Sequence, residues 1–212
     1  MLKQKNVEKK EKEEIKTIEK AVLSLLFEAA KNKEGALVVI GDLPEEKYSQ
    51  LFPNIFEGKK YNILDASIQP ILQRLISLDG AVIIKPDGEI KTIGAKINAY
   101  DRFPGHGMRH ATARGISKEG YVAMLASEED GLVRIFKEGN LLAEINPRTK
   151  TAKKSLDFIV EVLNRPETAI IASASIAAPM LSIPILPGVV VFAGSYLVAK
   201  NVLKFLKREM RE

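Results

Sequence analysis

One stretch of the sequence joins a glycine-rich loop to residue types that bind phosphate. Residues 105–114 read Gly-His-Gly-Met-Arg-His-Ala-Thr-Ala-Arg, and a helix is expected from Met108. Free backbone N–H groups and the positive end of a helix dipole favour an anion, and arginine can hold two of its oxygens. The stretch lacks the P-loop and Rossmann patterns. It predicts either a phosphate site of another kind or a flexible loop before a basic helix.

Acidic residues stand next to two of the expected strands. Asp79 and Gly80 directly precede the apolar run 81–84, and Gly80 permits close approach to the backbone. Residues 127–131 place three acids after another strand, where their oxygens can bind a hard cation. Both stretches can also be plain turns. An acid, an anion clamp and a second acidic patch are together what metal-assisted phosphoryl or nucleotidyl transfer uses.

The elements that position these residues predict an α/β body. Apolar residues at helical spacing predict a first helix that ends near Gly35. The short apolar runs 36–40 and 81–84 predict strands buried on both faces. Further strands are expected over 89–97, 121–126, 132–136 and 141–145, and helices over about 68–76 and 108–116. This alternation predicts a mixed β-sheet sandwiched by helices.

Composition excludes several classes of site. The 212 residues contain no Cys, which excludes disulfides and thiolate chemistry, and only two His, which argues against a multi-histidine metal site. The net charge of +5 is uneven, because residues 150–212 carry +4 of it. The body is thus nearly neutral, and no nucleic-acid partner is expected.

Three zones divide the chain. Residues 1–20 are a charged helical extension, residues 21–148 are the α/β domain, and residues 150–212 are an apolar tail with basic flanks. Twelve of the first 20 residues are charged, so the N-terminus does not resemble a signal peptide and the body is expected in the cytoplasm.

The tail contains 32 consecutive uncharged residues, 168–199, interrupted by prolines. This length exceeds one membrane span but falls short of two. We expect an apolar helical hairpin with arms at about 168–178 and 189–205, which dips into the inner face of the cell membrane through 168–206. The alternative is a pair of helices that pack on the body or on a partner subunit.

Ordered motifs in the body resemble the diadenylate cyclase (DAC) domain. They are 79–84 (Asp-Gly-Ala-Val-Ile-Ile), 107–110 (Gly-Met-Arg-His), 115–117 (Gly-Ile-Ser) and 127–129 (Ser-Glu-Glu), preceded by a similar opening helix and strand at 26–40. The resemblance covers about residues 15–148. It implies an enzyme that condenses two ATP into cyclic di-AMP and two pyrophosphates, in a face-to-face homodimer with Mg²⁺ or Mn²⁺.

The same resemblance implies roles for individual residues. Asp79 would help to activate the 3′-hydroxyl group and, with Glu128, would hold the metal, while Arg109 and His110 would act on the phosphates. The other expected ATP-binding residues are Gly80, Ala81, Ile97, Gly107, Thr112, Arg114 and Ser127.

Two positions depart from the family pattern. The family usually has Arg-His-Arg preceded by Thr, whereas this chain has Ala111 in place of the second Arg and Met108 in place of the Thr. Arg114 lies one helical turn after Ala111 and could replace the missing charge. The departures leave open a catalytically degenerate module that binds ATP or cyclic di-AMP and signals through its tail. A scaffold with no nucleotide role is the third interpretation.

Overall fold

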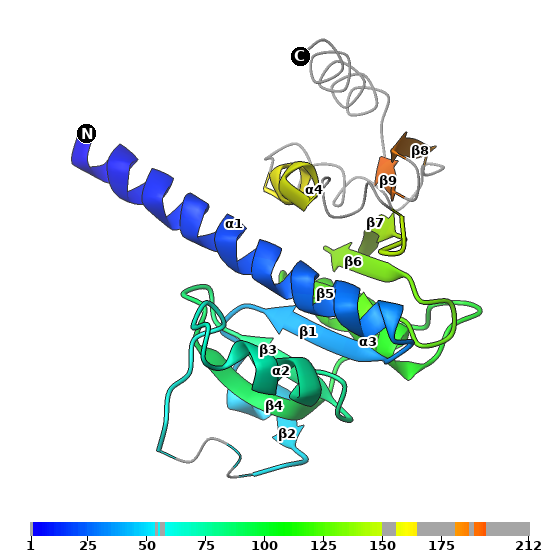
Figure 1. The fold of residues 1–212 in the computed structure, drawn as a ribbon, viewed down its shortest axis with the longest axis horizontal. Helices are drawn as coiled ribbons and strands as arrows, with labels where there is room; N and C mark the ends of the chain where they lie inside the picture. The colour runs from blue at the N-terminus through cyan, green and yellow to red at the C-terminus, as the bar shows by residue number, and fades with distance from the viewer. Residues whose placement is uncertain are drawn as a thin grey trace.

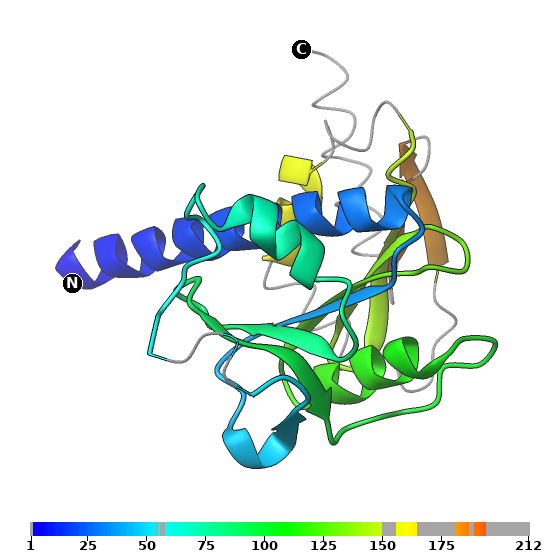
Figure 2. The same cartoon turned by 60° about the horizontal axis from the view of Figure 1, so that its bottom comes forward.

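The computed structural model describes residues 2–53, 55, 58–149, 156–164, 181–186 and 189–193. One mixed sheet forms its centre, in the order β2-β4-β3-β1-β5-β6-β7-β9-β8, and helices lie on both faces (Figures 1 and 2). Strand β1 (Ala36–Ile40) pairs in parallel with β3 (Ala81–Ile84) and antiparallel with β5 (Val122–Ala126). The predicted α/β class and mixed sheet are therefore confirmed.

In chain order the other elements are α1 (Leu2–Lys31), η1 (Glu45–Lys47), β2 (Tyr48–Gln50), α2 (Gln69–Leu75), β4 (Ile90–Ile97), α3 (Met108–Ser117), β6 (Val133–Lys137), β7 (Asn140–Ile145), α4 (Leu156–Leu163), β8 (Leu181–Leu186) and β9 (Val189–Ala193). Of these, α1, α2, β4, α3, β6 and β7 agree with the predicted body to within a few residues, whereas η1, β2, α4, β8 and β9 are additional to it.

Strand β1 separates two hydrophobic cores. All five of its residues are buried, as its continuous apolar run predicts. Val38 and Ile40 join the core beneath α1, α2 and α4, whereas Leu37 and Val39 join the core beneath α3. Successive side chains of a strand point to opposite faces, so one apolar run supplies both cores. Figure 2 shows α1 and α2 on one side of the sheet and α3 on the other.

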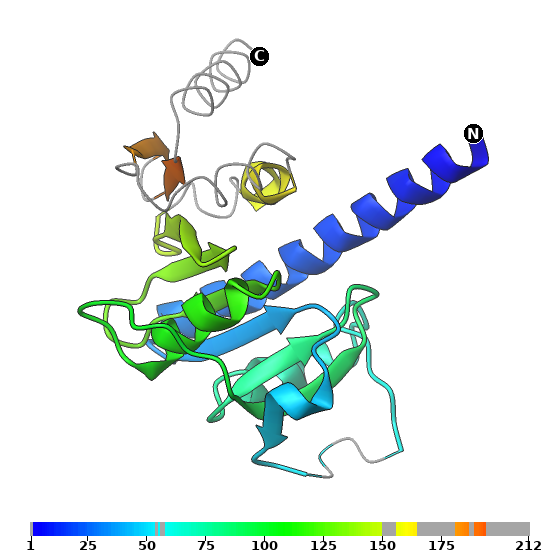
Figure 3. The same ribbon diagram turned by 180° about the vertical axis from the view of Figure 1, so that it is seen from behind.

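Helix α1 joins the charged extension and the start of the body into one continuous element. Its N-terminal half extends beyond the sheet (Figures 1 and 3). The helix ends at Lys31 because Lys33 adopts the left-handed conformation, with φ of 58°, and the Glu34 N–H group donates to the Ala29 carbonyl. The end therefore lies before Gly35, which was the expected stop.

The prediction of a helical hairpin in the tail is wrong for residues 189–193. These residues form β9, which pairs with β7 and with β8, because a run of β-branched valines suits a strand better than a helix. The first expected arm, 168–178, and the rest of the second arm lie outside the described residues. Within the described part of the chain, no helix has both the length and the apolar character that a membrane crossing requires.

Candidate functional site

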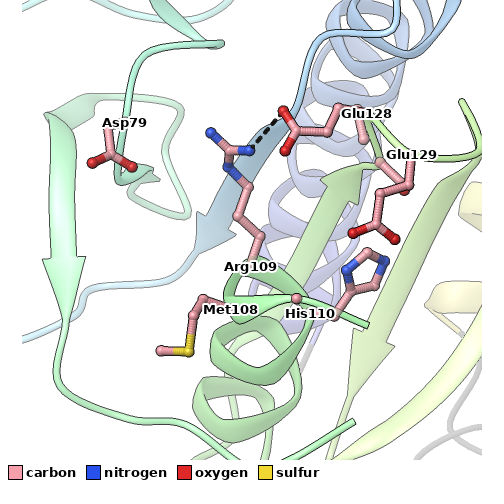
Figure 4. Close-up of a pocket in the computed structure, with 9 residues that line it drawn as sticks. Asp79, Met108, Arg109, His110, Glu128 and Glu129 are labelled. Carbon is pink, nitrogen blue, oxygen red and sulfur yellow. Dashed lines mark ion pairs between the residues drawn. The ribbon is translucent and has the colours of Figure 1, made fainter. Parts of the chain in front are cut away.

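A cavity of about 250 Å³ brings together the three stretches with phosphate or metal chemistry (Figure 4). It lies between the residue that leads into β3, the start of α3 and the loop that follows β5. The residues that line it are Asp79, Gly107, Met108, Arg109, His110, Ala126, Ser127, Glu128 and Glu129. The predicted catalytic and metal residues therefore surround one space.

Sheet topology explains why these stretches meet. Since β1 pairs in parallel with β3 and antiparallel with β5, the beginnings of β1 and β3 and the end of β5 lie at one edge of the sheet. Gly35 directly precedes β1, Ser127 directly follows β5, and Asp79 lies two residues before β3. Helix α3 packs beside β5 and supplies the third side of the cavity.

Arg109 and Glu128 form an ion pair across the cavity. Their closest atoms, Nη1 and Oε2, are 3.2 Å apart, and Figure 4 shows the guanidinium reaching from α3 toward the carboxylate. The Nε atom of Arg109 is buried and has no hydrogen-bond partner among the described residues. The guanidinium therefore keeps donor capacity for an anion.

Gly35 makes room for this ion pair, a role that sequence reasoning missed. A methyl group at position 35 would overlap Nη1 of Arg109 and would lie 2.9 Å from Oε2 of Glu128. A glycine before β1 is visible in the sequence, but the sequence does not show that the side chain of Arg109, from α3, fills the space beside it.

The N-terminus of α3 opens toward the same cavity. Gly107 is its N-cap in extended conformation, and no side chain caps the first turn. The helix has 10 residues, and its first N–H groups have no partner within the helix. Together with the Arg109 guanidinium, these N–H groups suit an oxyanion such as phosphate.

His110 is buried against a second arginine, Arg134 of β6. The His110 side chain is 4% exposed, and its Nε2 atom lies 3.1 Å from Nη1 of Arg134. Its ring stacks on that of His106, with centroids 4.4 Å apart. Burial, aided by the charge of Arg134 and by His106, lowers the pKa of His110 to about 4. His110 is therefore neutral at pH 7.

Arg134 is held in turn by two carboxylates. Its Nη2 atom donates to Oδ2 of Asp130 over 2.6 Å, and its Nε atom donates to Oε2 of Glu144 over 2.8 Å. Burial alone raises the pKa of Asp130, but hydrogen bonds from Arg134, the Leu132 N–H group and Ser127 outweigh it and lower that pKa to about 2. Sequence analysis missed Arg134, although a charge inside the apolar strand 132–136 requires buried partners.

Gly80 permits a close approach, as its residue type suggested, but the approaching group is the neighbouring strand. Gly80 has φ of 88°, and a methyl group there would lie 2.6 Å from the carbonyl carbon of Gly94 in β4. The register of β3 and β4 shifts just beyond this point, between Ala81 and Ile83. Gly80 thus shapes the strand entry that carries Asp79 rather than the cavity wall.

Four other expected ATP-binding residues also lie outside the cavity lining: Ala81, Ile97, Thr112 and Arg114. Ala81 is fully buried, and Ile97 packs against the core beneath α3. The Nε atom of Arg114 pairs with Oδ2 of Asp101 over 2.9 Å, and its Nη1 atom donates to the Arg102 carbonyl. Because this guanidinium is already bound elsewhere, the replacement of the missing arginine by Arg114 is not supported.

The carboxylates of the cavity can hold a metal only with help from a ligand. Asp79, Glu128 and Glu129 all line it, yet no group of three potential protein ligands is close enough to bind a metal among the described residues. Mg²⁺ is commonly bound by one or two carboxylates plus substrate phosphates. The donor set therefore fits a metal that arrives with a nucleotide.

Comparison with known sequences finds diadenylate cyclases. The family model described as "DAC: DisA bacterial checkpoint controller nucleotide-binding" matches residues 25–141. A protein named diadenylate cyclase from Methanocaldococcus jannaschii is 31% identical over 149 residues, which are 67% of this chain and 48% of that protein. Its namesake from Haloferax volcanii is 32% identical over 120 residues, which are 53% and 45% of the two chains. This chain spans about half the length of these relatives.

Comparison with solved structures finds two bacterial proteins. DacA from Staphylococcus aureus is 22% identical, with a TM-score of 0.47 over 69% of this chain and 93% of that chain. A protein from Bacillus cereus, described as a hypothetical membrane spanning protein, is also 22% identical, with a TM-score of 0.45 over 57% and 59%.

Proposed function

The chain belongs to the DAC family, and we propose that it is a diadenylate cyclase, a nucleotidyltransferase that condenses two ATP into cyclic di-AMP and two pyrophosphates. The observation that carries the proposal is the single cavity that joins Asp79 to Arg109 and the open N-terminus of α3. An acid opposite an anion clamp is the arrangement that attack by a hydroxyl group on a phosphate requires.

Three residues of the cavity and the N-terminus of α3 have distinct roles in this reaction. Asp79 accepts the proton of the attacking 3′-hydroxyl group. Arg109 and the first N–H groups of α3 bind the phosphates and stabilise the charge that develops on them. Because His110 is neutral, it can only donate one N–H group to a phosphate oxygen, and Arg109 supplies the positive charge.

Asp79 and Glu128 are the residues that would hold Mg²⁺ or Mn²⁺ together with the phosphates. A metal held there would supply positive charge to the leaving pyrophosphate. Glu128 already pairs with Arg109. The same carboxylate would therefore contact both the metal and the arginine that binds the phosphates.

The reaction joins two ATP, and the cavity of about 250 Å³ offers Arg109 and the N-terminus of α3 to bind phosphates. Two chains would therefore each bring one ATP to the reaction. A face-to-face homodimer then provides the alignment.

The test is incubation of the purified chain with ATP and either Mn²⁺ or Mg²⁺, with cyclic di-AMP and pyrophosphate quantified. We expect product, a rate per chain that rises with protein concentration as dimers form, and loss of activity with a chelator. An absence of product with both metals at high protein concentration would contradict the proposal.

Binding without catalysis is the second candidate function, and the altered clamp favours it. Arg114 is paired with Asp101, and Ala111 is buried outside the cavity lining, so the charge missing from the family pattern is not replaced. Calorimetric titration with ATP and cyclic di-AMP tests this candidate. Tight binding together with undetectable product would favour it, and Met108→Thr, at an exposed position that lines the cavity, should then create detectable activity.

The apolar tail is proposed to associate with the inner face of a membrane through residues 168–206. Its long uncharged run with basic flanks supports this, whereas the pairing of β9 with β7 supports the alternative that the tail packs on the body. Flotation of the full chain with anionic lipid vesicles distinguishes the two. Association with vesicles supports the membrane proposal, and recovery of all protein in the vesicle-free fraction contradicts it.

A further inference from the structure

The side chain of Arg134 is buried behind the cavity and does not line it. It is 4% exposed and cannot reach a ligand in the cavity. Its charge is met by Asp130 and Glu144, from the loop after β5 and from β7. Arg134 is therefore not a further phosphate clamp, and His110 is the residue among its bonded partners that lines the cavity.

The contact between Arg134 and His110 determines which ring nitrogen carries the proton. Nη1 of Arg134 lies 3.1 Å from Nε2 of His110. A guanidinium has only donors, so Nε2 must accept with its lone pair. The pKa of His110, lowered to about 4, indicates a ring with a single proton at pH 7. That proton then resides on Nδ1.

We propose that Arg134 is a positioning residue that fixes His110 as the Nδ1–H tautomer, so that the ring presents one defined N–H donor to a nucleotide phosphate. The part about phosphate rests on the proposed function. The part about the tautomer is a property of the chain without ligand.

The same guanidinium connects the elements around the site. It bonds to α3 through His110, to the loop after β5 through Asp130, and to β7 through Glu144. Each of its three nitrogens makes one of these contacts. The planar guanidinium is required because its nitrogens point in three different directions. Lysine keeps the charge but has one nitrogen, so it cannot hold His110 while it holds both carboxylates.

The first test uses nitrogen-15 NMR of the imidazole rings in the unliganded full chain at pH 7. The chain has only His106 and His110, so a His106→Gln variant assigns both rings. We expect a protonated Nδ1 and an unprotonated Nε2 for His110. A ring protonated on Nε2, or on both nitrogens, would overturn the proposal.

The second test compares Arg134→Lys with a matched control, Arg148→Lys. Arg148 is an exposed arginine whose guanidinium lies beside Gly131, in the loop after β5. For Arg134→Lys we expect a mixture of His110 tautomers and a fall in kcat of at least tenfold, with KM for ATP changed less than threefold. Arg148→Lys should change neither. An unchanged tautomer and unchanged kcat in folded Arg134→Lys would refute the positioning role.

If Arg134→Lys does not fold, the spectrum of the wild-type chain still decides the tautomer. If the wild-type chain forms no cyclic di-AMP, the proposed function fails, while the same spectrum continues to test the arrangement of Arg134 and His110.

Discussion

His110 and Glu19 are buried ionisable side chains on opposite faces of the same sheet. They are 4% and 3% exposed. Desolvation is the largest influence on both and favours the neutral form in each case: it lowers the pKa of His110 to about 4 and raises that of Glu19 to about 7. The two groups differ in their partners.

The partners decide how each face responds to pH. His110 lies against a guanidinium that can only donate to it, so the ring is neutral throughout the neutral range. Glu19 accepts a hydrogen bond from Asn164, which follows α4, and lies near the charges of Lys137 and Lys16, which lower its pKa but do not cancel the effect of burial. His110 therefore keeps its charge state near pH 7, whereas Glu19, at the junction of α1 and α4, ionises in that range.

Asp79→Asn tests the cavity face most strongly. Removal of the base proposed to accept the hydroxyl proton should lower the rate of cyclic di-AMP formation about 10³-fold. Asp79 is exposed, so the melting temperature should remain within about 2 °C of wild type. Product analysis and thermal unfolding check this. Activity within tenfold of wild type would show that the base has been assigned to the wrong residue.

Arg109→Ala should lower the rate about 10²- to 10³-fold, because one charged donor to the transferring phosphate is lost. Glu128 is exposed enough to remain hydrated without its partner, so stability should change little. Steady-state kinetics at saturating and limiting ATP measure the effect. A change in KM alone would mean that Arg109 binds the ground state and the transition state equally.

Glu19→Gln should alter stability and leave the cavity unaffected. Between about pH 4.5 and 7 the folded chain keeps a proton on Glu19 that the unfolded chain releases, so wild-type stability falls as pH rises through this window. The shift corresponds to about 3 kcal/mol. Gln cannot ionise, so the variant should be more stable than wild type by up to about that amount at pH 8 and nearly equal to it at pH 4.5.

Urea unfolding of the full chain at the two pH values measures this difference. Glu14→Gln, at an exposed position of the same helix, serves as the control and should show no such dependence. An equal gain in stability at both pH values would remove the ionisation of Glu19 as the cause.

Gly35→Ala should have the smallest effect, a loss of activity of about tenfold through displacement of the Arg109 guanidinium. The atoms in the way are the ends of two flexible side chains, so they can move and the melting temperature should be preserved. Cyclase assays and thermal unfolding of the variant check both statements. A large fall in melting temperature, with a cyclase rate of the folded variant equal to that of wild type, would contradict this. Gly35 would then be needed for the backbone conformation rather than for the position of Arg109.

Local pattern alone predicted most elements of the body. The run 36–40 indicated a strand buried on both faces, and Gly107 before a basic stretch indicated the start of α3. These features depend on neighbouring residues, and the structure reproduces them. The tail shows the limit: residues 189–193 were expected in a helix, but they form β9, where the strand preference of the valines and the pairing with a distant strand, β7, act together.

Residue type and order along the chain were enough to point to Asp79, Arg109 and Glu128 as the chemical groups of the proposed site. The surroundings of these groups depend on the folded chain. Gly35 clears space for an arginine more than 70 positions away, and Arg134 meets His110 from another element. Such contacts follow from the order of strands in the sheet and from desolvation. Both are set by the whole fold, so no local pattern encodes them.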